Sequence, residues 1–90
     1  MDPVSAQVSL YPLRTPHLSP SIEAFAQVLR DAGLHVEPGP MSTLVVGDAD
    51  TVFPALHRAF RAACAAHEVV MQVTISNACP REVGGSALRG

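Results

Sequence analysis

The sequence contains no tryptophan and no lysine, and one tyrosine and three phenylalanines are its only aromatic residues. Its six basic residues are all arginines, they form no run, and the net charge is −2. A surface that follows nucleic-acid phosphates needs clustered positive charge, usually with aromatic rings for stacking. We therefore expect no nucleic-acid partner.

Cysteine is also scarce. Cys64 and Cys79 form neither a CxxC unit nor a disulfide framework, and the four histidines share no metal-ligand spacing. Cys64 lies in an alanine-rich helical stretch, where we expect it to fill the core as a small apolar residue. We expect neither a metal nor another cofactor.

Long apolar runs are absent as well, because none reaches the roughly 18 residues of a membrane span. The start, Met1-Asp2-Pro3, lacks the basic and apolar regions of a signal peptide. These features predict a cytoplasmic protein without membrane insertion. The hydrophobic fraction of 48% and the charged fraction of 16% are typical of a folded chain. We expect one domain over residues 1–80, stabilised by self-association because it is small, and a flexible tail over 81–90.

The spacing of the apolar residues alternates between a strand period of two and a helix period of 3.6. Gly33 suits the left-handed position that ends a helix, and Asp48, Asp50 and Thr51 are three possible N-caps for a second helix. The buried stripe predicted for that second helix is Phe53, Leu56, Phe60, Ala63 and Cys64. The predicted elements are strands around 7–11, 34–37, 43–46 and 69–76, and helices from about 19 to 32 and from about 51 to 64.

This order of elements, β-α-β-β-α-β, predicts a ferredoxin-like α+β fold with two helices on one face of an antiparallel sheet. Alternation along the strands then separates the side chains into two faces. The residues expected to face the helices are Val8, Leu10, Leu34, Val36, Leu44, Val46, Met71, Val73 and Ile75. The open face is expected to carry Ser9, Tyr11, His35, Glu37, Thr43, Val45, Gln72, Thr74 and Ser76.

The predicted open face combines one aromatic ring with hydroxyls and an amide. Such a mixture can recognise a small polar heterocycle, because the ring stacks while the polar groups bond its nitrogens. The alternative is a plain solvated sheet face or a sheet-to-sheet contact between copies of the chain. The two interpretations are compatible, since a pocket can form where two such faces meet.

Several separate blocks of the sequence resemble the YkoF-like thiamine and hydroxymethylpyrimidine-binding family. They are Ser9-Leu10-Tyr11-Pro12, Met41-Ser42-Thr43 with Gly47, Val52-Phe53-Pro54-Ala55-Leu56 to Phe60, and Val69-Val70-Met71 to Thr74, Ser76 and Cys79-Pro80. The resemblance covers about residues 6–80. It implies binding of thiamine or its hydroxymethylpyrimidine precursor without catalysis, in bacterial thiamine salvage or transport. The YkoF-like pattern has two such domains in tandem, and a homodimer or homotetramer of this chain is expected to restore the pair.

Thiamine carries an aminopyrimidine and a cationic thiazolium, and the resemblance implies a role for each candidate residue. Tyr11 stacks on a ring or faces the cation, and Glu37 pairs with the cation. The ligand-binding set is Ser9, Tyr11, Glu37, Ser42, Thr43, Gln72, Thr74 and Ser76. Two alternatives stay open. In the first alternative, the domain is a structural or regulatory module whose open face serves only homo-oligomerisation. In the second, it is a cofactor-free enzyme of the dimeric ferredoxin-like type.

Overall fold

The computed structural model describes residues 2–16, 19–65 and 67–78; the tail predicted at 81–90 and Cys79 lie outside them. The elements are β1 (Pro3–Pro12), α1 (Ser19–Asp31), β2 (His35–Pro38), β3 (Thr43–Asp48), α2 (Ala49–Cys64) and β4 (Val69–Ser76). Their order and arrangement confirm the ferredoxin-like α+β fold. Neither helix has both the length and the hydropathy to cross a membrane, in the part of the chain that is described.

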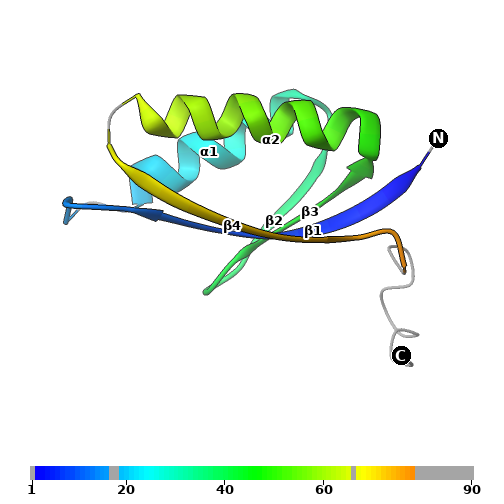
Figure 1. Ribbon diagram of the computed structural model, residues 1–90, viewed down its shortest axis with the longest axis horizontal. Helices are drawn as coiled ribbons and strands as arrows, with labels where there is room; N and C mark the ends of the chain where they lie inside the picture. Colours follow the sequence, from blue (N-terminus) through cyan, green and yellow to red (C-terminus); the bar gives the residue numbers. More distant parts are fainter. Residues whose placement is uncertain (1, 17–18, 66, 79–90) are drawn as a thin grey trace.

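The four strands form one antiparallel sheet in the order β2-β3-β1-β4. Both helices lie on one side of this sheet, and the other side is uncovered (Figure 1). The two central strands, β1 and β3, are therefore covered by helices on one face only. The short strand β2 and the longer strand β4 form the two edges.

The end of α1 confirms the role predicted for Gly33. Its φ angle is +90°, which a residue without a Cβ adopts at low cost. The Gly33 amide donates to the Arg30 carbonyl at 2.8 Å, and the Leu34 amide donates to the Leu29 carbonyl at 3.3 Å. This pair of bonds is a Schellman motif, and the buried Leu29 and Leu34 supply its hydrophobic contact.

Of the three possible N-caps for α2, the structure selects Asp48. Its carboxylate accepts a hydrogen bond from the Asp50 amide at 3.1 Å and another from the Asp2 amide at 2.7 Å. One side chain thus satisfies a free amide of the helix and holds the start of β1 against the end of β3.

The core lies between the helices and the covered face of the sheet. Along β1, every second residue is buried while its neighbours are exposed or partly exposed, which is the pattern of a strand with one covered face. The buried side chains of the hydrophobic core cluster are Val4, Ala6, Val8, Leu10, Phe25, Leu29, Leu34, Val45, Val52, Ala55, Leu56, Ala59 and Ala63.

The facing predicted for β3 is wrong. Val45 is fully buried and Thr43 is 6% exposed, both on the helix side, where they pair with Ala6 and Val8. Leu44 and Val46 lie on the open face opposite Gln7 and Ser5. The cause is the sequence of β3 itself, in which three successive apolar residues give no alternation, so that the register with β1 decides the facing.

The buried stripe of α2 is also shifted from its prediction. Phe53 is 56% exposed, Cys64 is exposed, and Phe60 is partly buried. The stripe observed is Val52, Ala55, Leu56, Ala59 and Ala63. It is rich in alanine because α2 packs directly on α1, and small side chains allow the two helices to approach closely.

Candidate functional site

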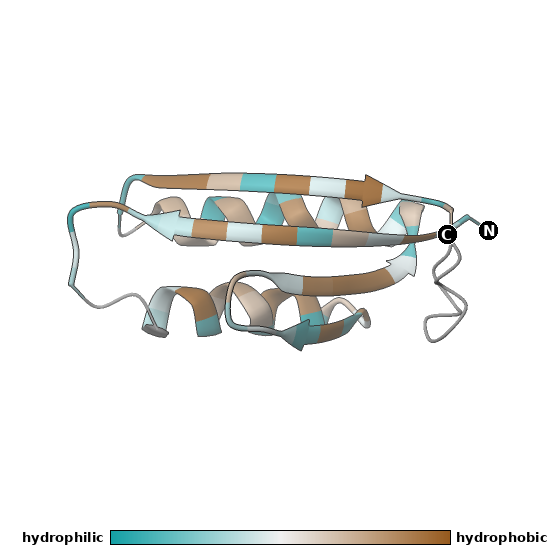
Figure 2. Cartoon of the chain, turned by 90° about the horizontal axis from the view of Figure 1, so that it is seen from below, coloured by the Kyte–Doolittle hydropathy of each residue, from teal (hydrophilic) through white to brown (hydrophobic). Residues whose placement is uncertain are grey.

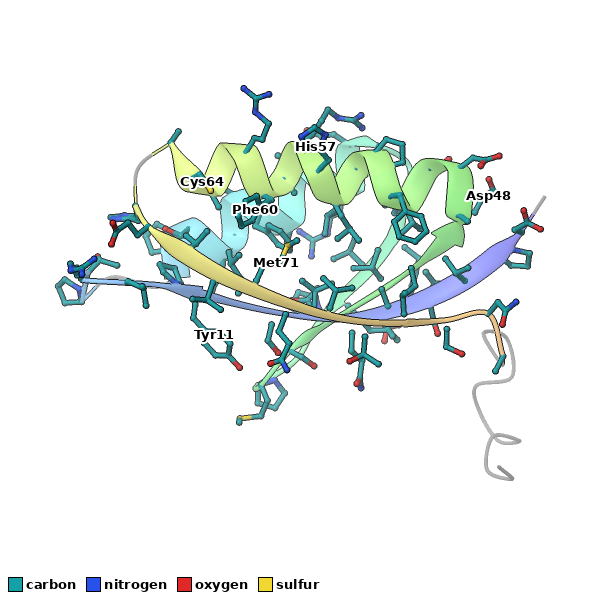
Figure 3. All side chains as sticks on the ribbon, viewed as in Figure 1. Tyr11, Asp48, His57, Phe60, Cys64 and Met71 are labelled. Carbon is teal, nitrogen blue, oxygen red and sulfur yellow. The ribbon has the colours of Figure 1, made fainter. Side chains whose placement is uncertain are left out.

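The open face of the sheet carries a double row of polar side chains along β1 and β4. Figure 2 views the molecule from this side, where hydrophobic and polar residues alternate along β1 and much of β4, and the middle of β3 is hydrophobic. In Figure 3, Tyr11 points away from the helices and Met71 points toward them. The register places Ser5, Gln7, Ser9 and Tyr11 opposite Ser76, Thr74, Gln72 and Val70.

Five of the predicted site residues share this double row: Ser9, Tyr11, Gln72, Thr74 and Ser76. Gln7 lies in the middle of the row between Leu44 and Thr74, and the prediction had omitted it. The signal was available, because Gln7 has the same strand parity as Ser9 and Tyr11.

Glu37 lies apart from this row. It belongs to the edge strand β2, and its carboxylate contacts the His35 Nε2 at 2.7 Å. Leu44 of β3 lies between Glu37 and Gln7 of β1. Glu37 and Gln7 are therefore two strand spacings, or about 10 Å, apart. Tyr11 lies a further four residues along β1. One ligand of two small rings cannot contact both Tyr11 and Glu37 within a single chain.

The open face is more apolar than the sequence predicted. Leu44 and Val46 join Tyr11 and Val70, which are 49% and 48% exposed. The face presents both polar groups and apolar area, and none of the hollows described below opens from the double row. Such a surface is suited to packing against another surface.

The remaining two predicted residues lie at the β2–β3 hairpin. Ser42 is in the loop, and Thr43 begins β3 with its side chain on the helix side, so its predicted place on the open face is wrong. The loop is closed by a hydrogen bond from the Gly39 amide to the Ser42 carbonyl at 2.8 Å. The Ser9 hydroxyl donates to the Met41 carbonyl at 3.4 Å, which ties the loop to β1.

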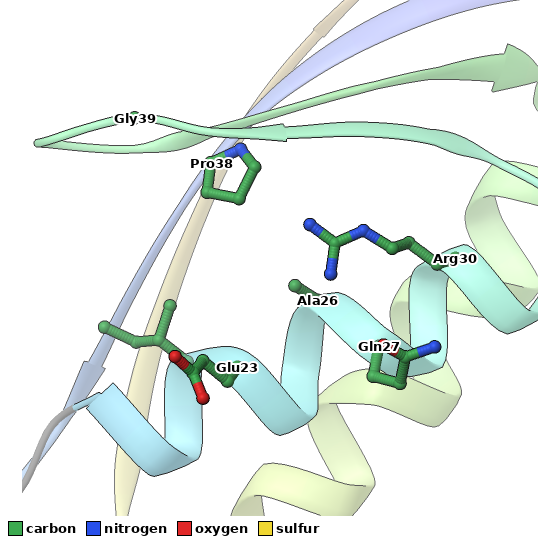
Figure 4. Close-up of a pocket in the computed structure, with 7 residues that line it drawn as sticks. Glu23, Ala26, Gln27, Arg30, Pro38 and Gly39 are labelled. Atoms are coloured by element: carbon green, nitrogen blue, oxygen red, sulfur yellow. The ribbon is translucent and has the colours of Figure 1, made fainter.

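Two hollows meet at this hairpin. A small cavity of about 70 Å³ is lined by Val8, Leu10, Ile22, Phe25, Gly39, Pro40, Met41, Ser42 and Thr43. A larger cleft of about 500 Å³ lies between α1 and the end of β2, and is lined by Ile22, Glu23, Ala26, Gln27, Arg30, Pro38 and Gly39 (Figure 4). Because both hollows share Ile22 and Gly39, they are neighbours at the hairpin.

The cleft has the size and composition of a small-molecule site. Binding pockets for such ligands span roughly 300 to 1,000 Å³ and combine apolar walls with a few polar groups. Ile22, Ala26 and Pro38 supply apolar surface, and Glu23 and Arg30 supply charges of opposite sign. The prediction missed these α1 residues, although the spacing of Ile22, Ala26 and Arg30 places them on one helical face.

The residues that the structure describes include no group of three or more His, Cys, Asp or Glu side chains arranged to hold a metal ion. Cys64, His67 and Glu68 line an open hollow at the end of α2, and Glu68 forms an ion pair with Arg14 at the surface.

The fold and the cleft define a class: a small ferredoxin-like domain with a ligand-sized hollow between its first helix and its β2–β3 hairpin. Residues 6–82 match the model of the thiamine-binding protein family, and the chain belongs to that family. The resemblance drawn from the sequence blocks is thereby confirmed.

The solved structures that share the fold include the following three. A hypothetical protein from Methanocaldococcus jannascii is 27% identical with a TM-score of 0.81, over 91% of this chain and 87% of that one. A domain of unknown function from Bacillus cereus is 24% identical with a TM-score of 0.72, over 83% and 75%. A Thermotoga maritima protein assigned provisionally to thiamine biosynthesis or salvage is 20% identical with a TM-score of 0.74, over 82% of each chain. No curated protein matches this chain.

Proposed function

We propose that this protein binds thiamine or its hydroxymethylpyrimidine precursor reversibly, without transforming it, in thiamine salvage or transport. The observation that carries the proposal is the cleft of about 500 Å³ beside the hairpin, in a chain that belongs to the thiamine-binding protein family. The cleft brings apolar surface, a carboxylate and the nearby hydroxyls of Ser42 and Thr43 into one region.

Each part of thiamine has a counterpart there. The aminopyrimidine alternates hydrogen-bond donors and acceptors, and a hydroxyl can serve either. We place it at the hairpin end, near Ser42 and Thr43. The thiazolium carries a positive charge, which the Glu23 carboxylate can pair with while Ile22 and Pro38 cover the ring. The small cavity of about 70 Å³ is too small for both rings, so the larger cleft holds most of the ligand.

The open face is assigned to self-association in this proposal. Leu44, Val46, Tyr11 and Val70 give it apolar area, and the polar rows of β1 and β4 can bond across an interface. A dimer or tetramer formed through this face leaves the cleft free, because the cleft lies on the helix side of the sheet. If no ligand binds, the same face supports the alternative of a structural or regulatory module.

The test is a matched pair of substitutions, Thr43→Val and Thr74→Val, titrated with thiamine and hydroxymethylpyrimidine by calorimetry. Each removes one hydroxyl at almost constant volume, at the hairpin in the first case and on the open face in the second. We expect Thr43→Val to weaken binding about tenfold, the value of one lost hydrogen bond of roughly 1 to 1.5 kcal/mol. Thr74→Val should leave the affinity unchanged.

The reverse pattern would move the ligand to the open face, where the sequence had placed it. An absence of saturable binding by the unsubstituted protein would overturn the proposal, and sedimentation of the same samples would then test the structural alternative. Mass spectrometry of the ligand after incubation decides against the proposal if a product accumulates, because that outcome supports the enzyme alternative.

A further inference from the structure

The cleft between α1 and β2 is lined by two side chains of opposite charge, Glu23 and Arg30. Glu23 and Arg30 lie seven residues apart on α1, which is about two turns and about 10 Å along the helix axis. In Figure 4 the Arg30 side chain extends over the cleft toward β2 and Pro38, while Glu23 lies nearer the start of the helix. Ala26 lies between these two residues along α1 and is 3% exposed, so it forms part of the cleft floor.

The Arg30 guanidinium has no ion pair or hydrogen bond with any other residue of the described ranges. The neighbouring Gln27 is engaged elsewhere, since its Nε2 donates to the Asp31 Oδ1 at 2.8 Å. Arginine is charged at all physiological pH values and presents planar N–H donors that match the oxygens of a phosphate. An available guanidinium over a cleft is therefore suited to an anionic end of a ligand.

The order of these groups along the cleft matches one ligand in particular. Ile22 and Gly39 line both hollows and mark the hairpin end, where Ser42 and Thr43 lie. Glu23 is next along α1, and Arg30 follows two turns later, with its side chain reaching back toward Pro38 (Figure 4). Thiamine has the same linear order of aminopyrimidine, thiazolium and hydroxyethyl group. With the pyrimidine at the hairpin and the cation beside Glu23, the hydroxyethyl group extends toward Arg30.

We infer that the cleft selects the phosphate monoester of thiamine over thiamine itself, with Arg30 as the residue that binds the phosphate. The inference rests on the proposed function and names its ligand class. It also separates two phosphorylated ligands. In hydroxymethylpyrimidine monophosphate the phosphate is one carbon from the pyrimidine, so with the pyrimidine at the hairpin we expect it to gain less from Arg30 than the phosphate of thiamine monophosphate does.

The test compares Arg30→Gln with the control Arg58→Gln, which removes an exposed arginine from α2, outside the cleft residues. Thiamine, thiamine monophosphate, hydroxymethylpyrimidine and its monophosphate are titrated at one fixed ionic strength, because salt screens exposed charges. We expect the unsubstituted protein to bind thiamine monophosphate about tenfold or more tightly than thiamine, the effect of one charge-assisted contact. Arg30→Gln should abolish this preference, and Arg58→Gln should preserve it.

Equal affinities for thiamine and thiamine monophosphate would overturn the inference while leaving the proposed function intact. So would an equal loss for both ligands in Arg30→Gln, because it would mean that Arg30 shapes the cleft and does not contact phosphate. An equal gain from phosphate on hydroxymethylpyrimidine would overturn the assigned orientation. Failure of all four ligands to bind would overturn the proposed function together with the inference.

Discussion

Replacing Val45 and Val46 in turn by threonine tests the facing of β3, because the two residues are neighbours on opposite sides of the sheet. The substitution exchanges a methyl group for a hydroxyl of similar size, so it leaves no cavity. Val45 is fully buried against the helices, whereas Val46 is only partly buried on the open face. A hydroxyl at Val45 enters an apolar core without water, and a hydroxyl at Val46 can still reach solvent.

The expected cost differs accordingly. An unsatisfied buried hydroxyl costs about 1 to 3 kcal/mol, so Val45→Thr should lower the free energy of unfolding by about 2 kcal/mol. For a domain of this size that corresponds to a fall in Tm of roughly 8 to 16 °C. Val46→Thr should cost less than about 0.5 kcal/mol, the usual effect of a surface substitution.

Both variants are to be unfolded by urea and by heat at two protein concentrations. Two concentrations are needed because a copy covering the open face would make the stability depend on concentration, most visibly for Val46→Thr at the higher one. Equal losses for the two variants at low concentration, or a larger loss for Val46→Thr, would refute the facing described for β3.

Two further predictions concern the ends of the helices. Gly33→Ala should lower the free energy of unfolding by about 1 kcal/mol, because alanine is strained at a φ of +90°. Urea unfolding would measure this loss, and an unchanged midpoint would contradict the Schellman geometry. Asp48→Ala should cost about 1 to 2 kcal/mol and Asp50→Ala roughly 0.3 to 0.5 kcal/mol, since Asp48 caps α2 and Asp50 only favours the helix dipole. Equal losses for the two variants in the same assay would show that Asp48 is not the N-cap of α2.

How far the sequence predicted the structure varies from element to element. In β1, the alternation of Val8 and Leu10 with polar neighbours indicated the strand at 7–11 and its covered face, although the strand observed begins earlier, at Pro3. In β3, consecutive apolar residues left both facings acceptable, and hydrogen bonding with β1 decided between them. In α2, apolar residues on more than one side of the helix allowed two stripes, and the close approach of α1 selected the one with small side chains.

The candidate site shows the same division. Strand parity was enough to place Ser9, Tyr11 and Gln72 together, because β1 and β4 are neighbours in this fold. The cleft was not predictable in this way, since Glu23 and Arg30 on α1 meet Pro38 of β2 only after the crossover has returned the chain to the sheet. The shape of the cleft depends on the distances between α1 and β2, and the hydrophobic period along one element gives no information about such distances.

The sequence by itself determined the elements, their order and the fold, because backbone propensities, caps and hydrophobic periods act over a few residues at a time. It also indicated the family, because several separate blocks of residues match the family's pattern. Tertiary structure alone decided which face of β3 is buried, which stripe of α2 packs, and where a ligand-sized hollow lies. Those outcomes depend on the register between strands and on the packing of helix against sheet, and both join residues that are far apart in the chain.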